Sequence, residues 1–410
     1  MNKERNKTWF PCLAVFFLFT FALTGNAQLI HLKSIPLATG DQFLLFPSER
    51  LGMGQVSIAL KDRQLDPFVN PAKGSRVQGI QLFGAPNYYS ITNQGGSART
   101  LSVGALYQNS RWFGGFLTSV QELRRAEESD FVRPLYYYPG LLSDKSSNNT
   151  YFSGYLGKQL IPKNISFGAS LFYADLAALD GVDWLYANSQ RVEQSGKLLD
   201  VRFGVLGELP GQKTYEALLL HTKFDMTHEV YNPVYPVFMR TPSIMTPVPE
   251  KEINRDKTNT WGIHLGYRQP LGNRDWKIGT IFTANYKTHP KIPNYQIMNI
   301  PRDPGNSRAF NFGVGFSRRH QKATFGLDLI YQPIWSTTWA TAQEKIETAG
   351  GWIIYPGERT VDNNFKFSNS ILRIGIQREN QRTGFQLGLQ VHTYRYRLKQ
   401  RDYIQRTLRK

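Results

Sequence analysis

Two runs of alternating hydrophobic and small or polar residues lie between Arg308 and Tyr331, separated by a polar turn. Every second residue is hydrophobic, namely Phe310, Phe312, Val314 and Phe316, then Phe325, Leu327, Leu329 and Tyr331. The residues between them are Asn311, Gly313, Gly315, Ser317, Thr324, Gly326 and Asp328. Because successive side chains of a strand point to opposite faces, this pattern predicts an antiparallel hairpin with one apolar and one polar face.

The same alternation recurs from residue 76 onward and predicts thirteen strands, although three of them alternate poorly. They are expected at about residues 76–93, 99–108, 112–122, 149–160, 165–176, 199–209, 213–224, 259–269, 275–287, 308–318, 322–333, 365–378 and 382–397, of which 112–122, 149–160 and 213–224 are the poor ones. Bacterial single-chain membrane barrels have an even number of strands. We therefore expect about 14, with the missing strand at 53–60, at 351–356 or in the C-terminal tail.

Short and long connections alternate between the predicted strands. The long ones are expected at about residues 123–148, 177–198, 225–258, 288–307 and 334–364. Outer-membrane barrels keep short turns at the periplasmic end and long loops outside, whereas a soluble sandwich has no reason to treat its ends differently. The pattern favours an all-β fold, a transmembrane antiparallel barrel with its apolar face toward lipid. The alternative is a soluble exported β-sandwich or lectin, which would bury that face against a second sheet.

Residues 1–27 have the composition of a secretory signal peptide. Three basic residues precede an apolar run at 8–24, and Ala27 provides a small residue before Gln28. The run is short for a membrane span of about 20 residues, so we expect cleavage after Ala27 and export to the outer membrane of a Gram-negative bacterium. Cys12 is the only cysteine and lies in this peptide, so the mature chain is expected to have no disulfide and no thiolate metal site.

Residues 28–75 lack the strand pattern and contain two short motifs. These are Leu51-Gly52-Met53-Gly54, followed by Val56-Ser57-Ile58-Ala59-Leu60-Lys61-Asp62, and Asn70-Pro71-Ala72-Lys73 just before the first predicted strand. In this order they resemble the N-terminus of the FadL-type superfamily of outer-membrane proteins, which includes the long-chain fatty-acid transporters and the PorV-like proteins of the type IX secretion system. The chain departs from the family pattern at Gln55-Val56 and at Lys61-Asp62-Arg63.

The resemblance implies a 14-stranded barrel with an N-terminal hatch inside its lumen. Here the hatch would be residues 28–75, with Gly52, Met53, Gly54, Asn70, Pro71 and Ala72 as its motif residues. The barrel would be residues 76–397, followed by a basic tail at 398–410. The implied function is a channel or transporter for hydrophobic or amphipathic small molecules. The alternative is a PorV-like scaffold that serves a protein-secretion system and transports nothing itself.

If the apolar faces meet lipid, the opposite faces line the lumen and bring charged residues there. These are Arg202, His264, Arg268, Lys277, Asp328, Arg373 and His392. Most are cationic, so an anionic amphipathic ligand such as a carboxylate is favoured. The alternative is that they pair with one another as barrel filler, because buried polar groups need partners. The seven histidines show no metal-ligand spacing, and no nucleophile or phosphate-loop motif appears, so no enzyme, metal or cofactor is expected.

Two predicted loops are rich in aromatic residues, Tyr235 and Phe238 in one and Trp335, Trp339 and Trp352 in the other. They are expected either to pack over the barrel mouth or to form an external apolar platform for a ligand or partner. The net charge of +18 is expected to favour outer-membrane lipid and lipopolysaccharide, anionic ligands or, in the scaffold alternative, secretion-system proteins. Nucleic acid is not an expected partner outside the cytoplasm.

Overall fold

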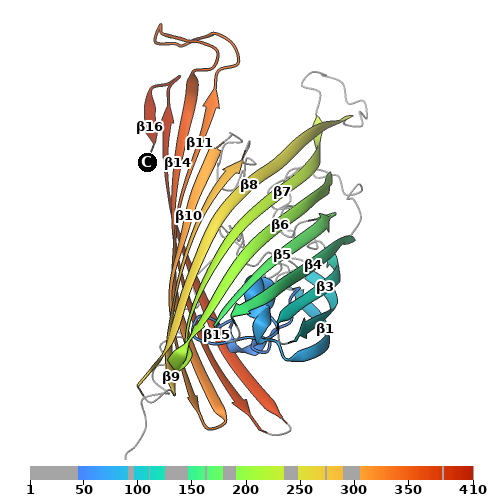
Figure 1. Cartoon of the computed structure of the whole chain (residues 1–410). Helices are drawn as coiled ribbons and strands as arrows, with labels where there is room; N and C mark the ends of the chain where they lie inside the picture. The colour runs from blue at the N-terminus through green and yellow to red at the C-terminus, as the bar shows by residue number, and fades with distance from the viewer. Residues whose placement is uncertain are drawn as a thin grey trace, which may run out of the picture. The chain divides into compact units, whose positions relative to one another are not determined.

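The computed structural model describes residues 45–90, 97–109, 111–124, 146–161, 164–178, 191–234, 248–272, 275–289, 305–380 and 383–409. These residues form one antiparallel sheet of fourteen strands, in which strands that follow one another in the chain are neighbours (Figure 1). A second, two-stranded sheet lies in the connection between β11 and β14. No helix in the described part of the chain is long and apolar enough to cross a membrane.

The large sheet is built from strands of very different length. They are β1 (Gly79–Ser90), β2 (Ser97–Gln108), β3 (Trp112–Arg124), β4 (Ser146–Ile161), β5 (Ile165–Leu176), β6 (Arg191–Leu209), β7 (Lys213–Val234), β8 (Val248–Leu271), β9 (Trp276–His289), β10 (Gly305–His320), β11 (Ala323–Thr341), β14 (Arg359–Glu379), β15 (Gly384–Asp402) and β16 (Thr407–Arg409). The small sheet pairs β12 (Ile346–Glu347) with β13 (Ile353–Ile354). The ladders run from β1 to β16, and among the described residues none joins β1 to β15 or β16.

The prediction of an all-β, antiparallel fold with fourteen strands is confirmed. All thirteen predicted strands form, and the fourteenth is the return strand β16. Residues 53–60 form no strand, while 351–356 contribute β13 to the separate small sheet. Within the segment predicted as a tail, 398–410, β15 continues to Asp402 before the chain turns back into β16.

Several strands extend beyond their predicted ends, which corrects the predicted loops at 225–258 and 334–364. β7 reaches Val234 and β8 begins at Val248, so both strands enter the first of these segments. Trp335 and Trp339 lie in β11 and are not loop residues. The hydrophobic alternation stops where the outward side chains become polar, although the strands continue. The hydrophobic alternation therefore indicates which residues face an apolar environment, but it does not show where a strand ends.

The hydrophobic face of the predicted hairpin points away from the inside of the sheet. β10 and β11 pair with Phe312 opposite Tyr331 and Val314 opposite Leu329, and these side chains are 37–49% exposed. The intervening Gly315 and Asp328 are buried on the other face. Outward hydrophobic residues on other strands, such as Phe203, are exposed in the same way. No second layer of described residues large enough to form a sandwich covers this face.

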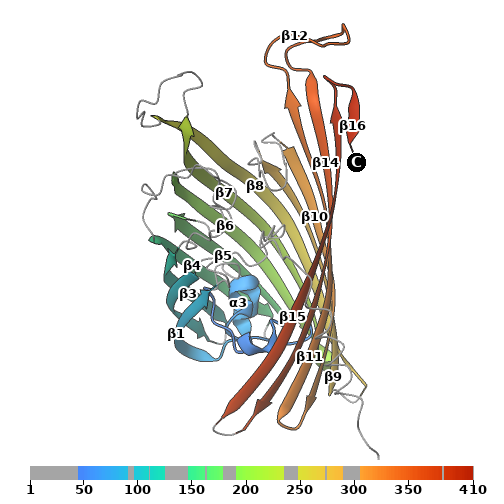
Figure 2. The same cartoon turned by 180° about the vertical axis from the view of Figure 1, so that it is seen from behind.

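Because the strands alternate in direction, the short connections at 109–111, 210–212 and 321–322 lie at one end of the sheet. We call this the short-turn end, and it is at the bottom in Figure 1. The long connections lie at the opposite, long-loop end. The inner face of the sheet curls around residues 45–78, which we call the hatch segment; Figure 2 shows its helix α3 (Asp66–Val69) inside the curl.

Candidate functional site

The hatch segment is fixed to the inner face by arginine side chains that reach its backbone. Arg268 Nη1 donates a 2.7 Å hydrogen bond to the carbonyl oxygen of Leu60, and Arg202 Nη1 donates one of 3.0 Å to that of Val69. Arg373 Nη1 donates one of 3.1 Å to the carbonyl of Gln55. Three of the cations predicted to line the lumen are thus hydrogen-bonded to the hatch segment. Hydrogen bonds with one charged partner are stronger than neutral ones.

Asp328 holds the same part of the hatch segment through two backbone donors. Its Oδ2 accepts hydrogen bonds from Ser57 N at 2.8 Å and from Ile58 N at 3.2 Å. The side chain is fully buried in β11. The Ser317 hydroxyl donates to the carbonyl of Ala59 at 3.1 Å. A chain without regular secondary structure buries N–H and C=O groups that need partners, and the sheet supplies them here.

Glycines on the inner face let the hatch segment lie directly on the strands. A Cβ at Gly315 would be 2.6 Å from Ile58 Cβ, and one at Gly326 would be 2.6 Å from Val56 Cγ1. A Cβ at Gly388 in β15 would collide with the backbone of Gly54. Gly54 itself has φ +63°, a left-handed conformation that favours glycine. The small residues of the polar face thus form a track for residues 52–58.

The Asn-Pro-Ala motif forms a buried corner on the same inner face, against strands β5, β6 and β7. Asn70 caps the helix η2 (Pro71–Arg76) by accepting a hydrogen bond from Ala72 N at 3.2 Å. Its amide nitrogen donates to Glu216 Oε2 at 2.9 Å. Asn70 and Ala72 are completely buried, and Asn70 packs on Gly204 of β6, where a Cβ would collide with it. Of the other motif residues, Gly52 donates its N–H to Gln386 Oε1 at 2.9 Å, and Met53 is fully buried.

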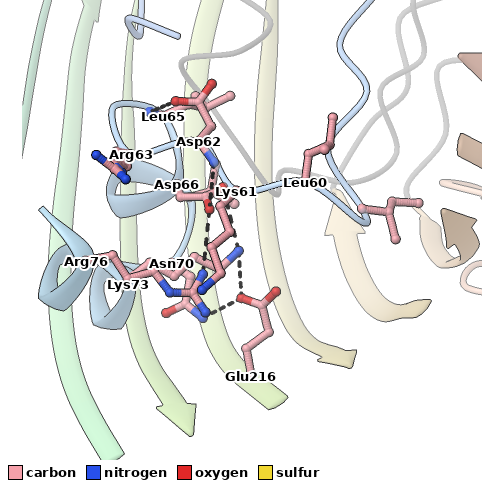
Figure 3. Close-up of polar contacts among 12 residues, drawn as sticks. Leu60, Lys61, Asp62, Arg63, Leu65, Asp66, Asn70, Lys73, Arg76 and Glu216 are labelled. Carbon is pink, nitrogen blue, oxygen red and sulfur yellow. Dashed lines mark hydrogen bonds and ion pairs between the residues drawn. The ribbon is translucent and has the colours of Figure 1, made fainter. Parts of the chain in front are cut away.

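Ion pairs connect this corner to the neighbouring strands (Figure 3). Lys73 Nζ lies 2.9 Å from Glu216 Oε2 and 3.8 Å from Asp66 Oδ1, with both partners nearly buried. Arg76 Nε lies 2.9 Å from Glu208 Oε1, which is also 3.4 Å from Lys61 Nζ. Burial and the nearby charge of Arg76 lower the pKa of Lys61 to about 8. Burial likewise raises the pKa of Asp62, although Leu65 N and the Ser48 hydroxyl donate hydrogen bonds to it.

An aromatic cluster joins the hatch segment to strands β2–β7. Phe68 stacks on Phe46 with ring centroids 4.8 Å apart and meets Tyr155 edge-on at 5.5 Å. The buried residues of this cluster are Leu45, Phe68, Val77, Leu106, Phe113, Leu117, Tyr151, Tyr155, Phe172, Ala174, Leu176, Leu198 and Met226. Among the described residues, the buried hydroxyl of Tyr155 has no hydrogen-bond partner.

The sequence did not identify this cluster, because strands β3 and β4 are hydrophobic on both faces. Phe113 and Leu117 point inward, while Phe116 and Val120 point outward. This explains the poor alternation at 112–122 and 149–160. Two inner glutamines were also missed. Gln386 Nε2 donates to the carbonyl of Glu49 at 2.7 Å, and Gln377 Oε1 accepts from Arg50 Nη1 at 3.1 Å.

The other predicted lumen residues lie on the inner face but do not touch the hatch backbone in any hydrogen bond described. His264 is buried, with Nδ1 2.8 Å from Thr283 Oγ1 and Nε2 4.0 Å from Glu216 Oε1. Lys277 is half-buried near the short-turn end of β9, and His392 contacts Gln390 within β15.

Of the predicted external aromatic residues, the three in the described part of the chain do not all lie on one element. Trp335 is exposed on the outward face of β11 and contacts Phe310 at 5.5 Å, and Trp339 lies under Arg359. Trp352 lies between β12 and β13 and stacks with Arg406. Tyr235 and Phe238 fall outside the described residues. Among the described residues, no group of three His, Cys, Asp or Glu side chains is arranged to hold a metal ion.

No protein-family model matches this sequence, and no curated protein does either. Three of the similar solved structures are bacterial proteins. The Pseudomonas putida toluene transporter TodX is 10% identical, with 84% of this chain and 95% of that one covered and a TM-score of 0.35. The E. coli K12 ferric-catecholate import receptor Fiu is 8% identical, with 80% of this chain and 62% of that one covered and a TM-score of 0.39. The beta domain of the Bordetella autotransporter BrkA is 11% identical, with 76% of this chain and 98% of that one covered and a TM-score of 0.26. Because these TM-scores lie below 0.5, the function of the chain is inferred below from its own geometry.

Proposed function

We propose that this chain is an outer-membrane transporter of hydrophobic or amphipathic small molecules, gated by its hatch segment. The observation that carries the proposal is the way residues 50–61 are held. The sheet holds them through individual side chains that bind backbone atoms, such as those of Arg268, Arg373 and Asp328, and through the packing of Ile58 on Ile330 and Ile371. A plug held in this way can be released one contact at a time while the sheet stays intact.

An outer-membrane location is supported by the outward face of the sheet. Its exposed hydrophobic residues follow strand after strand, and aromatic residues with cations beside them lie near both strand ends. Lys158 lies over Trp112 and Arg318 over Trp276 toward the short-turn end, whereas Lys366 lies over Trp335 toward the other. Outer-membrane barrels have such an apolar band between two aromatic girdles.

The inner face offers chemistry for an amphipathic ligand once the hatch segment moves. Ile330 and Ile371 would lose the cover of Ile58 and become available to an apolar ligand. Arg268 and Arg373 would lose their backbone acceptors in residues 50–61, and a carboxylate could take the place of those carbonyl oxygens. Ligand and hatch would then compete for the same arginines, which couples binding to opening.

Flux measurements in proteoliposomes test this proposal. The mature chain and a variant lacking residues 28–75 would be reconstituted, and the entry of a labelled long-chain carboxylate and of toluene would be followed. Deletion should change the flux of both compounds clearly. Equal flux through both proteins, each shown to be inserted by heat-modifiable migration on a gel, would contradict gating by this segment.

A second candidate is a docking scaffold for a secretion system, and the strand lengths favour it specifically. β7 and β8 have 22 and 24 residues, whereas about 9–11 residues span a membrane. With the β12–β13 hairpin, these extensions offer a platform at the long-loop end. Stable co-purification with a large secretion complex, together with no flux of either compound, would favour this function over transport.

A further inference from the structure

A patch of basic side chains interrupts the outward face of the sheet on β15. The outward positions of this strand begin with Phe385, Leu387, Leu389 and Val391, and after Thr393 they continue with Arg395, Arg397, Lys399 and Arg401. All four cations are exposed. The change from hydrophobic to basic therefore occurs within one strand, on the side of the long-loop end.

The register places further cations beside this run. Lys366 of β14 lies directly opposite Arg397, Trp335 of β11 lies opposite Lys366, and Arg308 of β10 lies opposite Trp335. One outward row across four strands thus reads Arg308, Trp335, Lys366 and Arg397. Like charges directly opposite each other in neighbouring strands are unfavourable. An anion bound beside Lys366 and Arg397 would offset this repulsion.

The described part of the protein does not supply that anion. No outward position of β15 carries an acid, and no acidic side chain is described as an ion-pair partner of Lys366, Arg395, Arg397 or Lys399. The nearest acid on β14, Asp362, is opposite Arg401 and is bound by Arg359 at 2.8 Å and by the Tyr403 hydroxyl at 2.7 Å.

The corresponding region of β7 and β8 shows that this excess of cations over acids is local to β15. There Lys251 lies 2.7 Å from Glu229, and Lys257 lies 3.7 Å from Asp225, its partner in the register. Two of the bases on the outward face of β8 thus have acidic partners on β7.

We propose that Arg308, Lys366, Arg395, Arg397 and Lys399 form a binding surface for the phosphorylated headgroup of the outer leaflet's glycolipid, lipid A. The surface continues directly from the apolar belt, so a lipid whose chains pack on Val391 and Leu389 would bring its headgroup to the cations. Arg and Lys bind phosphate through charge-assisted hydrogen bonds, and basic residues near an anionic lipid surface strengthen the binding. This inference depends on the proposed outer-membrane location but not on transport.

The test measures binding of fluorescent lipid A, with both phosphates, to the detergent-solubilised mature chain. The variant Lys366→Gln/Arg395→Gln/Arg397→Gln is compared with Lys251→Gln/Arg255→Gln/Lys257→Gln, which removes the same charge from the outward face of β8. We expect the first variant to raise the Kd about tenfold or more and the second less than about twofold. Dephosphorylated lipid A should bind the unaltered protein about as weakly as lipid A binds the first variant.

Equal losses in the two variants, or binding that does not depend on phosphate, would overturn the proposal. So would complete displacement of lipid A by inorganic phosphate, which would identify a site for the free ion. If the first variant does not fold, the unaltered protein still decides the question, because salt should weaken lipid A binding far more than binding of the dephosphorylated lipid. A chain that is soluble without detergent and shows no heat-modifiable migration would instead refute the outer-membrane location itself.

Discussion

The two halves of the hatch segment are held in different ways. Residues 50–61 lie on a glycine track along β9–β15 and are fixed by single side chains, such as Asp328, that bind backbone atoms. Residues 62–78 are packed into an aromatic cluster and a buried ion-pair cluster against β2–β8. The first attachment combines these contacts with small apolar clusters around Val56 and Ile58, whereas the second belongs to a much larger buried cluster. We therefore expect residues 50–61 to detach first and residues 62–78 to stay in place as the anchor.

The largest loss of stability should come from a substitution in the anchor, residues 62–78. Phe68→Ala would empty the centre of the aromatic cluster, where its ring meets those of Phe46 and Tyr155. A loss of about 3–5 kcal/mol in the free energy of unfolding is typical of such a cavity. Denaturant titration in detergent would measure it. The control is Phe203→Ala on the outward face, where detergent fills the space, and a similar loss in both variants would contradict a core around Phe68.

The glycine track should respond to a single added carbon. Gly388→Ala would force its Cβ against the backbone of Gly54, which has the left-handed conformation and little freedom to shift. Overpacking of this kind costs about 1–3 kcal/mol. Protease cleavage or hydrogen exchange within residues 50–61 should increase, while residues 66–76 remain protected. Gly384→Ala is the matched control in the same strand, because the nearest atom to its Cβ would be 4.0 Å away.

The loss of a single acceptor should have an effect of similar size on the same half. Asp328→Ala leaves Ser57 N and Ile58 N without an acceptor, and leaving a buried donor unpaired costs about 1–3 kcal/mol. Asp328→Asn keeps an oxygen there and should lose less. Hydrogen exchange at Ser57 and Ile58 would distinguish the two variants. If the two amides exchanged equally slowly in both variants and the unaltered chain, Asp328 would have no role in holding residues 50–61.

The sequence could predict features that follow from a local pattern, but not contacts between residues far apart in the chain. Phe312 and Val314 lie on one exposed face of the sheet, as the alternation predicts, because a strand with one apolar face has a period of two. Phe113 was not assigned to the interior, because its strand is hydrophobic on both sides. The cationic inner face was predicted, but not that Arg268 and Arg373 bind the hatch backbone. Such a contact joins residues more than two hundred positions apart and leaves no local pattern.

The smallest expected effect is a pH dependence at the junction of the two halves, where Lys61 lies beside Glu208 and Arg76. The pKa of Lys61 is lowered to about 8 in the docked segment, mainly by burial, whereas a free lysine has a pKa of about 10.4. Between these values the docked state binds fewer protons than the undocked state. Docking should therefore strengthen as the pH rises from about 8 to about 10.4.

A fluorophore on residue 51 would report this change, since the mature chain is expected to have no cysteine of its own and Leu51→Cys places a thiol at an exposed site in the segment. Its emission should shift toward the docked value as the pH increases across this interval. In the Lys61→Gln background the shift should disappear, because no proton is then released on docking. The Lys61 side chain is 45% exposed, so solvent screening should keep the effect small. A persistent shift in that background would assign the pH dependence to another group, and the junction would then not distinguish the two halves.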